Sequence, residues 1–364
     1  MSTAALGDRL DAPLGAPLGD RSMPSAAIVV IPCLNEERYI ENTLSRFMAE
    51  PPETVRKIVV ADGGSTDRTL AIVAACAKHD DRIAILHNER RIQSSGVNRA
   101  VERYGDLAPF LIRADAHADY PARYCATLLQ AQAQTGAQSV VVSMIAKGTT
   151  CFQTAAAAAQ NSRLGNGGSA HRMAAEGRFV DHGHHALMEV KAFRAVGGYD
   201  EGFSHNEDAE LDARLGLTGA RIYLCAGADI TYYPRKGPLS LFNQYRNFGR
   251  GRAMNIVKHR SRPKLRQLIP VMVGPAVCLS ALSPVSPIFA VPALCWAAAS
   301  LVLGLIEGVR QRNFCVGAAG CTAMLMHLGF STGFVVEVLR QAVRASPQAG
   351  RGAFPATLPA ADQS

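Results

Sequence analysis

The chain has 364 residues and a formal net charge of +8, enough for one large domain or two modest ones with additional segments. Its hydrophobic content of 48% is unevenly distributed, and residues up to about Arg262 have the composition of an ordinary globular protein. The nine cysteines are scattered and include no Cys-x-x-Cys pair. These features argue against a zinc cage and a disulfide framework, so we expect reduced thiols.

Residues 1–25 contain Asp8, Asp11 and Asp20 among several prolines and glycines, and they include no apolar stretch of useful length. This composition is not that of a secretory signal peptide. We therefore expect a disordered N-terminal tail and a catalytic part that stays in the cytoplasm.

The next 200 residues alternate short apolar runs with segments of helical spacing, a pattern that predicts an α/β fold with a mostly parallel sheet and helices on both faces. The last three of the expected helices come after this alternation, and residues 165–169 between them are expected to be flexible. The expected strands are 26–31, 55–61, 83–86, 110–112 and 139–145, and the expected helices are 36–48, 67–77, 94–101, 121–133, 151–160, 190–196 and 208–217.

Residues 235–266 contain ten lysines and arginines and no acidic residue. A basic stretch just before an apolar segment is typical of a cytoplasmic juxtamembrane region and attracts anionic lipid or phosphate. Nucleic-acid binding is the competing interpretation, but the stretch lacks interleaved aromatic residues and a known binding module. We therefore expect no nucleic-acid partner.

Two long apolar runs follow. Residues 268–306 include no charged residue or histidine over 39 positions, and residues 313–336 are interrupted only by His327. A membrane-spanning helix needs about 20 apolar residues, so we expect membrane insertion rather than buried core helices. The first run could form two helices turning at 284–287, which gives three crossings, or it could re-enter and keep Arg340 and Arg344 in the cytoplasm.

The predicted organisation therefore has five parts, and the expected location is the cytoplasmic membrane, with several crossings and the catalytic domain facing the cytoplasm. The parts are a disordered tail (1–25), a catalytic domain (26–235), a basic juxtamembrane segment (236–267), a membrane region of two or three helices (268–338) and a flexible tail (339–364).

Polar residues follow the first two expected strands, at the edge of the sheet where ligands bind in open α/β folds. Asn35 and Glu36 come after the strand that ends at Pro32, and their turn could grip a nucleotide or simply cap a helix. Asp62 ends the second strand and could accept hydrogen bonds from a base or ribose. Gly63 and Gly64 allow the backbone to approach a ligand closely.

Asp115 and His117 share one side of an extended segment, because alternate residues of a strand face the same way. They could hold a divalent ion that neutralises a departing diphosphate. The imidazole tilts the choice between Mg²⁺ and Mn²⁺ slightly towards Mn²⁺. Asp119 is a spare carboxylate, and we expect it to cap the following helix.

Asp208 stands at the start of an expected helix, where a carboxylate could be a cap or a general base that deprotonates an attacking hydroxyl. The segment 181–185, Asp-His-Gly-His-His, resembles a metal cluster. We favour a substrate-lining loop that offers His184 and His185, because no further cysteine or histidine accompanies it.

Together these elements resemble the inverting, family-2 glycosyltransferases of the GT-A fold, and most closely the bacterial succinoglycan glucosyltransferase group, the ExoA group. The resemblance covers roughly residues 26–270. The segments that carry it are 29–37 (VVIPCLNEE), 60–67 (VADGGSTD), 92–98 (IQSSGVN), 113–121 (RADAHADYP), 196–201 (VGGYDE) and 206–211 (NEDAEL).

This resemblance implies roles for single residues. Pro32, Asn35 and Glu37 would line the nucleotide pocket, and Asp62 would contact uracil. Asp115 would belong to the Asp-x-Asp metal motif, and Asp208 would be the catalytic base.

The sequence departs from the family pattern in two places. His117 replaces the second Asp of the metal motif, which makes the metal less certain. The segment 244–250 lacks the Arg-Trp ending of processive synthases, which favours transfer of a single sugar. Arg246, Arg250 and Arg252 would then hold the diphosphate of the donor or of a lipid acceptor.

The resulting hypothesis is a membrane-associated hexosyltransferase that moves one sugar, glucose by resemblance, from a UDP-sugar to a saccharide on polyprenyl diphosphate in exopolysaccharide assembly. The alternatives are a nucleotidyltransferase on a similar sheet, which usually has a glycine-rich basic loop after the first strand, and a silent nucleotide-sugar-binding scaffold. Intact carboxylates at Asp62, Asp115 and Asp208 argue against the scaffold.

Overall fold

The computed structural model describes residues 26–167, 176–263 and 265–345. An eight-stranded sheet forms its catalytic half, in the order β3-β2-β1-β4-β7-β5-β8-β6. Only β7 and β6 run antiparallel to their neighbours. The strands are β1 (Ala27–Cys33), β2 (Val55–Asp62), β3 (Ile83–His87), β4 (Phe110–Arg113), β5 (Ser139–Ala146), β6 (Arg178–Val180), β7 (His184–Glu189) and β8 (Ile222–Tyr232).

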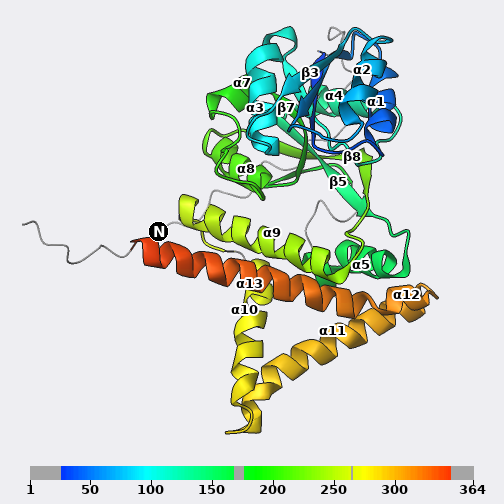
Figure 1. Ribbon diagram of the computed structural model, residues 1–364. Helices are drawn as coiled ribbons and strands as arrows, with labels where there is room; N and C mark the ends of the chain where they lie inside the picture. The colour runs from blue at the N-terminus through cyan, green and yellow to red at the C-terminus, as the bar shows by residue number, and fades with distance from the viewer. Residues whose placement is uncertain (1–25, 168–175, 264, 346–364) are drawn as a thin grey trace, which may run out of the picture.

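Helices cover both faces of this sheet and then continue below it (Figure 1). Those of the catalytic half are α1 (Ile40–Met48), α2 (Thr69–Ala77), α3 (Gln93–Tyr104), α4 (Tyr124–Thr135), α5 (Cys151–Asn161), α6 (Arg163–Asn166), α7 (Val190–Ala195) and α8 (Glu207–Leu217). The remaining helices are four long ones, α9 (Pro238–His259), α10 (Leu265–Leu279), α11 (Val291–Arg310) and α13 (Ala319–Ala345), and the short α12 (Phe314–Gly317).

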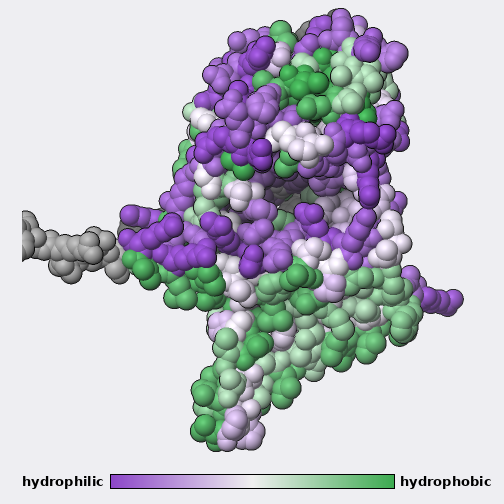
Figure 2. Space-filling model, viewed as in Figure 1, coloured by the Kyte–Doolittle hydropathy of each residue, from purple (hydrophilic) through white to green (hydrophobic). Residues whose placement is uncertain are grey.

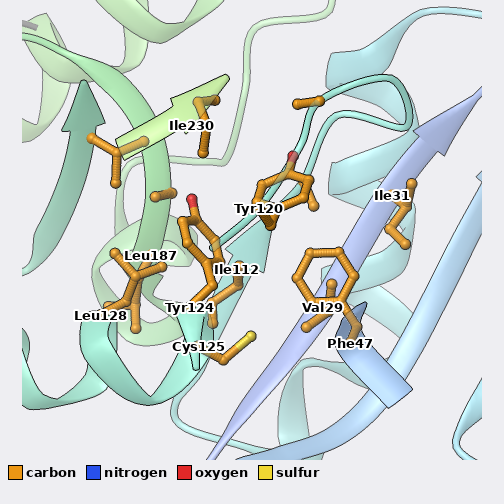
Figure 3. Packing of buried hydrophobic residues seen from close by; sticks show 14 of the residues in the cluster. Val29, Ile31, Phe47, Ile112, Tyr120, Tyr124, Cys125, Leu128, Leu187 and Ile230 are labelled. Carbon is orange, nitrogen blue, oxygen red and sulfur yellow. The ribbon is translucent and has the colours of Figure 1, made fainter. Parts of the chain in front are cut away.

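The central strand β1 is apolar on both faces, as expected for a parallel strand covered by helices on each side. Because its side chains alternate, Val29 and Ile31 join one core cluster, while Ile28 and Val30 join the cluster on the opposite face. In the first cluster the ring of Phe47 lies 5.1 Å from that of Tyr120 (Figure 3). This packing fixes β1, β2 and β4, whose carboxyl ends carry the candidate site.

Below the sheet, α9 and α13 lie side by side and run in the same direction (Figure 1). Glycines allow their backbones to approach closely: a Cβ on Gly333 would lie 1.8 Å from the carbonyl oxygen of Arg246, and one on Gly329 would lie 2.5 Å from that of Phe242. Small residues spaced four apart allow two helix backbones to lie this close together.

The helices α10 and α11 form a V that points away from the sheet (Figure 1). Where α11 meets the α12–α13 segment, the contact again uses small residues. A Cβ on Gly304 would lie 2.3 Å from the backbone of Gly320, and one on Gly308 would lie 2.5 Å from that of Gly317. Any larger side chain at either α11 glycine would push the two helices apart.

Two helical segments, 287–310 and 314–344, are long and apolar enough to cross a membrane by length and composition. Only 11% of the most apolar window of the first is buried within the protein, against 44% for the second. The first therefore exposes its apolar side chains instead of packing them into a core.

The predicted α/β fold with a mostly parallel sheet is confirmed. Three local expectations were wrong. Asp119 does not cap the following helix, because α4 begins at Tyr124 without a side-chain cap and Asp119 pairs with Thr231 instead. His184 and His185 begin strand β7 instead of lying on a loop, because β7 pairs with both β4 and β5. Cys151 and Cys315 form a disulfide, because α5 and α12 pack together, although reduced thiols were expected. The expected tails at 1–25 and 346–364 and part of the expected flexible segment 165–169 lie outside the described residues.

Candidate active site

The turn after β1 and the turn after β2 are joined by hydrogen bonds from side chains. Asn35 has a φ of 57° and accepts a hydrogen bond from the amide of Thr66 at 2.8 Å, while its own amide donates to the Ser65 hydroxyl at 2.9 Å. Glu37 accepts from the amide of Arg68 at 3.1 Å. Asn35 and Glu37 thus fix one turn to the other, and neither is among the residues that line the pocket beside these turns.

Asp62 is buried at the end of β2 and organises its own turn. Its carboxylate accepts hydrogen bonds from the amide of Gly64 at 2.8 Å and from the Ser65 hydroxyl at 2.5 Å. Gly64 has a φ of +88°, which explains why glycine occupies that position. The carboxylate that was expected to meet a base therefore also holds the turn in place.

A small pocket of about 120 Å³ opens beside these turns, and Pro32, Gly63, Asp115 and His117 are among the residues that line it. The Nδ1 atom of His117 lies 3.0 Å from a carboxylate oxygen of Glu36. This hydrogen bond raises the pKa of His117 above its ordinary value. The structure therefore brings Pro32, Asp115 and His117 together at one edge of the sheet, as predicted.

Arg113 connects the two carboxylates that matter most for chemistry. Its guanidinium is only 5% exposed, donates to Asp208, and lies 3.3 Å from a carboxylate oxygen of Asp115. The guanidinium also donates a hydrogen bond to the side-chain oxygen of Gln93 at 2.7 Å, which further fixes its orientation. Although burial opposes ionisation, Arg113 lowers the pKa values of Asp115 and Asp208, so both are anionic.

His184 lies between the same two carboxylates at the start of β7. Its Nε2 atom is 3.4 Å from Asp115, and its Nδ1 atom is 3.7 Å from Asp208. With 13% of its side chain exposed, it can contact a bound molecule. His184 therefore lies close to both Asp115 and Asp208, and its contact with a substrate stays a prediction.

His185 occupies a different place, because its side chain is fully buried behind Asp208 and cannot reach a substrate. Its Nε2 atom lies 2.7 Å from Asp212, and its Nδ1 atom lies 2.7 Å from the Tyr199 hydroxyl. Despite the opposing effect of burial, Asp212 and Asp208 raise the pKa of His185. This buried histidine supports the base from behind.

Glu207 precedes Asp208 at the start of α8 and has the opposite electrostatic character. Burial, followed by the nearby charge of Asp208, raises the pKa of Glu207 to about 7. The guanidinium of Arg113 lies 3.7 Å from the Glu207 carboxylate. The adjacent carboxylates thus differ sharply, and only Asp208 is held fully ionised.

The three predicted arginines of α9 point in different directions. Arg252 lines the large cavity described below. Arg250 lies 3.1 Å from the buried Glu337 of α13, and the backbone of Arg246 packs against Gly333. Arg246 and Arg250 do not line this cavity. The face of α9 that carries them is turned towards α13.

A cavity of about 1570 Å³ runs from Asp115 and Asp208, past α9, to the apolar helices. Single small-molecule sites usually measure about 300–1,000 Å³, so this cavity can hold more than one ligand group. Figure 2 shows a hollow between the upper, sheet-containing part and the hydrophilic residues at the level of α9, with the hydrophobic surface over α10 and α11 further below.

No three histidine, cysteine or acidic side chains converge as a complete metal cage among the residues that the structure describes. Asp115 nevertheless offers a hard oxygen ligand, with His184 3.4 Å away. Mg²⁺ and related ions in phosphate chemistry commonly take one or two carboxylates and complete their shell with substrate phosphates and water. The residues fit a cation that arrives with a nucleotide diphosphate.

Sequence reasoning missed Arg113, Gln93, Tyr199 and Asp212 as functional residues. Arg113 stands two positions before Asp115, so its side chain faces the same side of the strand end. That spacing could have identified it. Asp212 and Tyr199 meet His185 only after α8 and β7 pack, and the sequence offers no local signal for that contact.

Comparisons with known proteins agree with this geometry. The glycosyl transferase family 2 model matches residues 28–197. The chain is 48% identical over 320 residues to the succinoglycan biosynthesis protein ExoA of Rhizobium meliloti (strain 1021), which covers 88% of this chain and 97% of that protein.

A more distant relative is the dolichyl N-acetyl-alpha-D-glucosaminyl phosphate 3-beta-D-2,3-diacetamido-2,3-dideoxy-beta-D-glucuronosyltransferase of Methanococcus voltae, 27% identical over 241 residues (63% of this chain, 74% of that one). Among solved structures, the mannosyltransferase PcManGT from Pyrobaculum calidifontis, in complex with GDP-Man and Mn²⁺, has a TM-score of 0.57 at 17% identity, covering 85% and 88% of the two chains. That likeness supports the GT-A fold. The chain therefore belongs to glycosyl transferase family 2.

Proposed function

We propose that this glycosyltransferase moves a single sugar, with glucose as the first candidate, from a UDP-sugar to a saccharide carried on polyprenyl diphosphate. The observation that carries the proposal is the single cavity that joins Asp115 and Asp208 to apolar helices. The 48% identity to a succinoglycan biosynthesis protein supports a role in exopolysaccharide assembly.

The donor would bind at the edge formed by β1, β2 and β4. Pro32, Asn35, Glu37 and Asp62 lie in or hold the two turns at this edge, and the pocket of about 120 Å³ beside them has room for part of a nucleotide, such as its base. Asp62 would accept a hydrogen bond from the base through the lone pairs that its turn leaves free.

A divalent cation, Mn²⁺ or Mg²⁺, would be held by Asp115, with His184 or His117 beside it, and by the donor's own phosphates. When bound, it would supply positive charge that stabilises the departing diphosphate. The chain's own contribution at this place is Arg113, which fixes the direction of Asp115. Arg252 adds positive charge from α9.

Asp208 would accept the proton of the attacking hydroxyl. Arg113 keeps this carboxylate ionised and aimed into the cavity, where 14% of its side chain is exposed. Because its pKa is lowered, the Asp208 carboxylate is a weak base towards a free hydroxyl. The acceptor hydroxyl becomes more acidic as its oxygen bonds to the anomeric carbon, so the proton transfer is easier in the transition state. Attack from the face opposite the leaving group inverts the anomeric configuration.

The acceptor side supports attachment to a membrane. The V of α10 and α11 exposes large apolar side chains, among them Leu294 at 64% and Met272 at 60%. Because α13 lies along α9 on the side of the sheet, we propose that only the V enters the bilayer, from the cytoplasmic face. This arrangement keeps Arg340 and Arg344 in the cytoplasm and follows the positive-inside tendency.

Neither of the two alternative functions, a nucleotidyltransferase and a silent nucleotide-sugar-binding scaffold, gains support. Membership of family 2 argues against a nucleotidyltransferase. The paired, ionised Asp115 and Asp208 argue against a silent scaffold, because buried charges held towards a cavity cost stability without a chemical use.

The test is UDP release by detergent-purified protein with a panel of UDP-sugars and either Mn²⁺ or Mg²⁺, with and without saccharides on polyprenyl diphosphate. We expect metal-dependent release that the lipid acceptor stimulates, and a product whose new bond has the inverted configuration by NMR. UDP binding without release under every combination would refute the proposal.

A further inference from the structure

The lower end of the large cavity is walled by three apolar helices and is continuous with the catalytic end. A hydrogen-bond chain holds this wall together: Trp296 donates to Nδ1 of His327 at 3.2 Å, and Nε2 of His327 lies 2.9 Å from the carbonyl oxygen of Leu164. The apolar lining residues are Ile269 and Pro270 of α10, Trp296 and Ala299 of α11, and Met326 and Phe330 of α13.

Basic residues line the cavity between its two ends. Arg163 directly precedes Leu164, so it borders the apolar end, and Arg262 lies in the connection that leads into α10. The acidic residues Glu207 and Asp208 line the catalytic end. Along the cavity the lining therefore changes from carboxylates to arginines to apolar side chains.

We propose that the apolar end is a prenyl site, which binds the first isoprene units of a polyprenyl diphosphate while Arg163 and Arg262 bind its phosphates. This inference rests on the proposed function, which places a saccharide above the diphosphate. A molecule with a polar head, two phosphates and one apolar chain matches the three zones in order. A phospholipid has two chains, whereas the cavity offers one apolar end.

Trp296 is the only tryptophan in the sequence, so its fluorescence reports on the prenyl site alone. Polyprenyl diphosphate is titrated into the full-length protein in detergent. We expect a saturable change in emission. Geranyl diphosphate, polyprenol and phosphatidic acid should each bind at least tenfold more weakly, and inorganic pyrophosphate should leave the emission unchanged.

Two neighbouring alanines of α11 provide matched variants. Ala299 and Ala298 are both exposed, but only Ala299 lines the cavity. Ala299→Phe should fill the prenyl site and weaken binding of polyprenyl diphosphate at least tenfold, whereas Ala298→Phe should change it less than twofold. Arg163→Gln, a second test that leaves α10, α11 and α13 untouched, should bring the affinity for polyprenyl diphosphate close to that for polyprenol.

Equal effects of the two alanine variants, or equal binding of phosphatidic acid, would overturn the prenyl site. The two levels of the account can be separated. Tight binding of polyprenyl diphosphate that Ala299→Phe abolishes, without sugar transfer from any donor, would support the prenyl site and overturn the proposed function. Sugar transfer to a lipid acceptor that Ala299→Phe leaves unchanged would support the proposed function and overturn the prenyl site.

Discussion

Arg113 donates a hydrogen bond to Asp208 while the same guanidinium lies 3.3 Å from Asp115. One buried cation thus sets the distance and direction between the candidate base and the candidate metal ligand. Planar, forked donors suit this task, because two carboxylates can be held at once in fixed orientations.

Replacing Arg113 with Lys should therefore damage catalysis although the charge is kept. A single ammonium group cannot contact Asp208, Asp115 and Gln93 together, and we expect kcat to fall by roughly 100-fold. Steady-state kinetics with the preferred UDP-sugar measure this effect. Arg103→Lys, on the exposed face of α3, is the control and should leave kcat unchanged. Equal kcat in both variants would remove Arg113 from the site.

Glu207 should make the protein less stable as the pH rises. Burial and the charge of Asp208 raise its folded-state pKa from 4.5 to about 7, so the folded state binds the proton more tightly than the unfolded state does. Its contribution to stability is present below pH 4.5 and is lost as the pH rises through 7.

Glu207→Gln removes this titration. We expect its free energy of unfolding at pH 8 to exceed that of the parent by on the order of 2 kcal/mol, with little difference at pH 4.5. Denaturant unfolding at both pH values measures the difference. Glu102→Gln, at an exposed position of α3, should show no such pH dependence. A variant less stable than the parent at pH 8 would contradict the assignment.

The buried pair of His185 and Asp212 should stabilise the fold within a definite pH window. The pKa of Asp212 is lowered in the folded state, so the contribution of this carboxylate to stability is present above pH 3.8 and is lost as the pH falls below that value. The raised pKa of His185 makes its contribution complete below 6.5, and it is lost as the pH rises through the folded-state pKa. Both conditions hold between about pH 4 and 6.5.

Asp212→Asn should accordingly cost about 3 kcal/mol at pH 5.5 and less at pH 9, because removing one partner leaves a buried charge unpaired. Thermal unfolding across this range checks the expectation. Asp106→Asn, which breaks an exposed pair with Arg194, should cost less than about 1 kcal/mol at either pH. A cost for Asp212→Asn that increases towards pH 9 would show that His185 is neutral.

Gly333 tests the contact between α9 and α13. A leucine there would place its Cβ 1.8 Å from the Arg246 carbonyl oxygen, and overpacking of this kind costs about 1–3 kcal/mol. We expect Gly333→Leu to lower the midpoint of thermal unfolding in detergent by several degrees. The control is Gly317→Ala, because a Cβ at Gly317 meets nothing within 4 Å. Equal midpoints would mean that the two helices do not touch there.

Much of the fold followed from local patterns. Strand β1, the part of β2 from Ile58 onward and strand β4 are almost entirely buried, so they appear in the sequence as short apolar runs. Strand β7 was missed because it begins with two histidines, whose burial depends on partners in α8.

The helical half was only partly predictable, because its contacts also join segments that are far apart in the sequence. The basic stretch indicated a membrane surface, but α9 has glycines and arginines on the face that meets α13, and only the packed pair explains them. The strand-end residues Asp62, Asp115 and Asp208 were predictable because ligand-binding edges follow from sheet topology. The positioning residues were not, since Arg113 and His185 act through contacts between distant segments.

The central claim is that Asp208 takes the proton in a direct displacement, and Asp208→Asn tests it most directly. Calorimetric titration with the preferred UDP-sugar and single-turnover transfer to the lipid acceptor are measured together, with the exposed Asp119→Asn as control. We expect donor affinity within about threefold of the parent and turnover lower by at least ~10³-fold, at the level typical for loss of a general base. Near-normal turnover in Asp208→Asn would contradict the account.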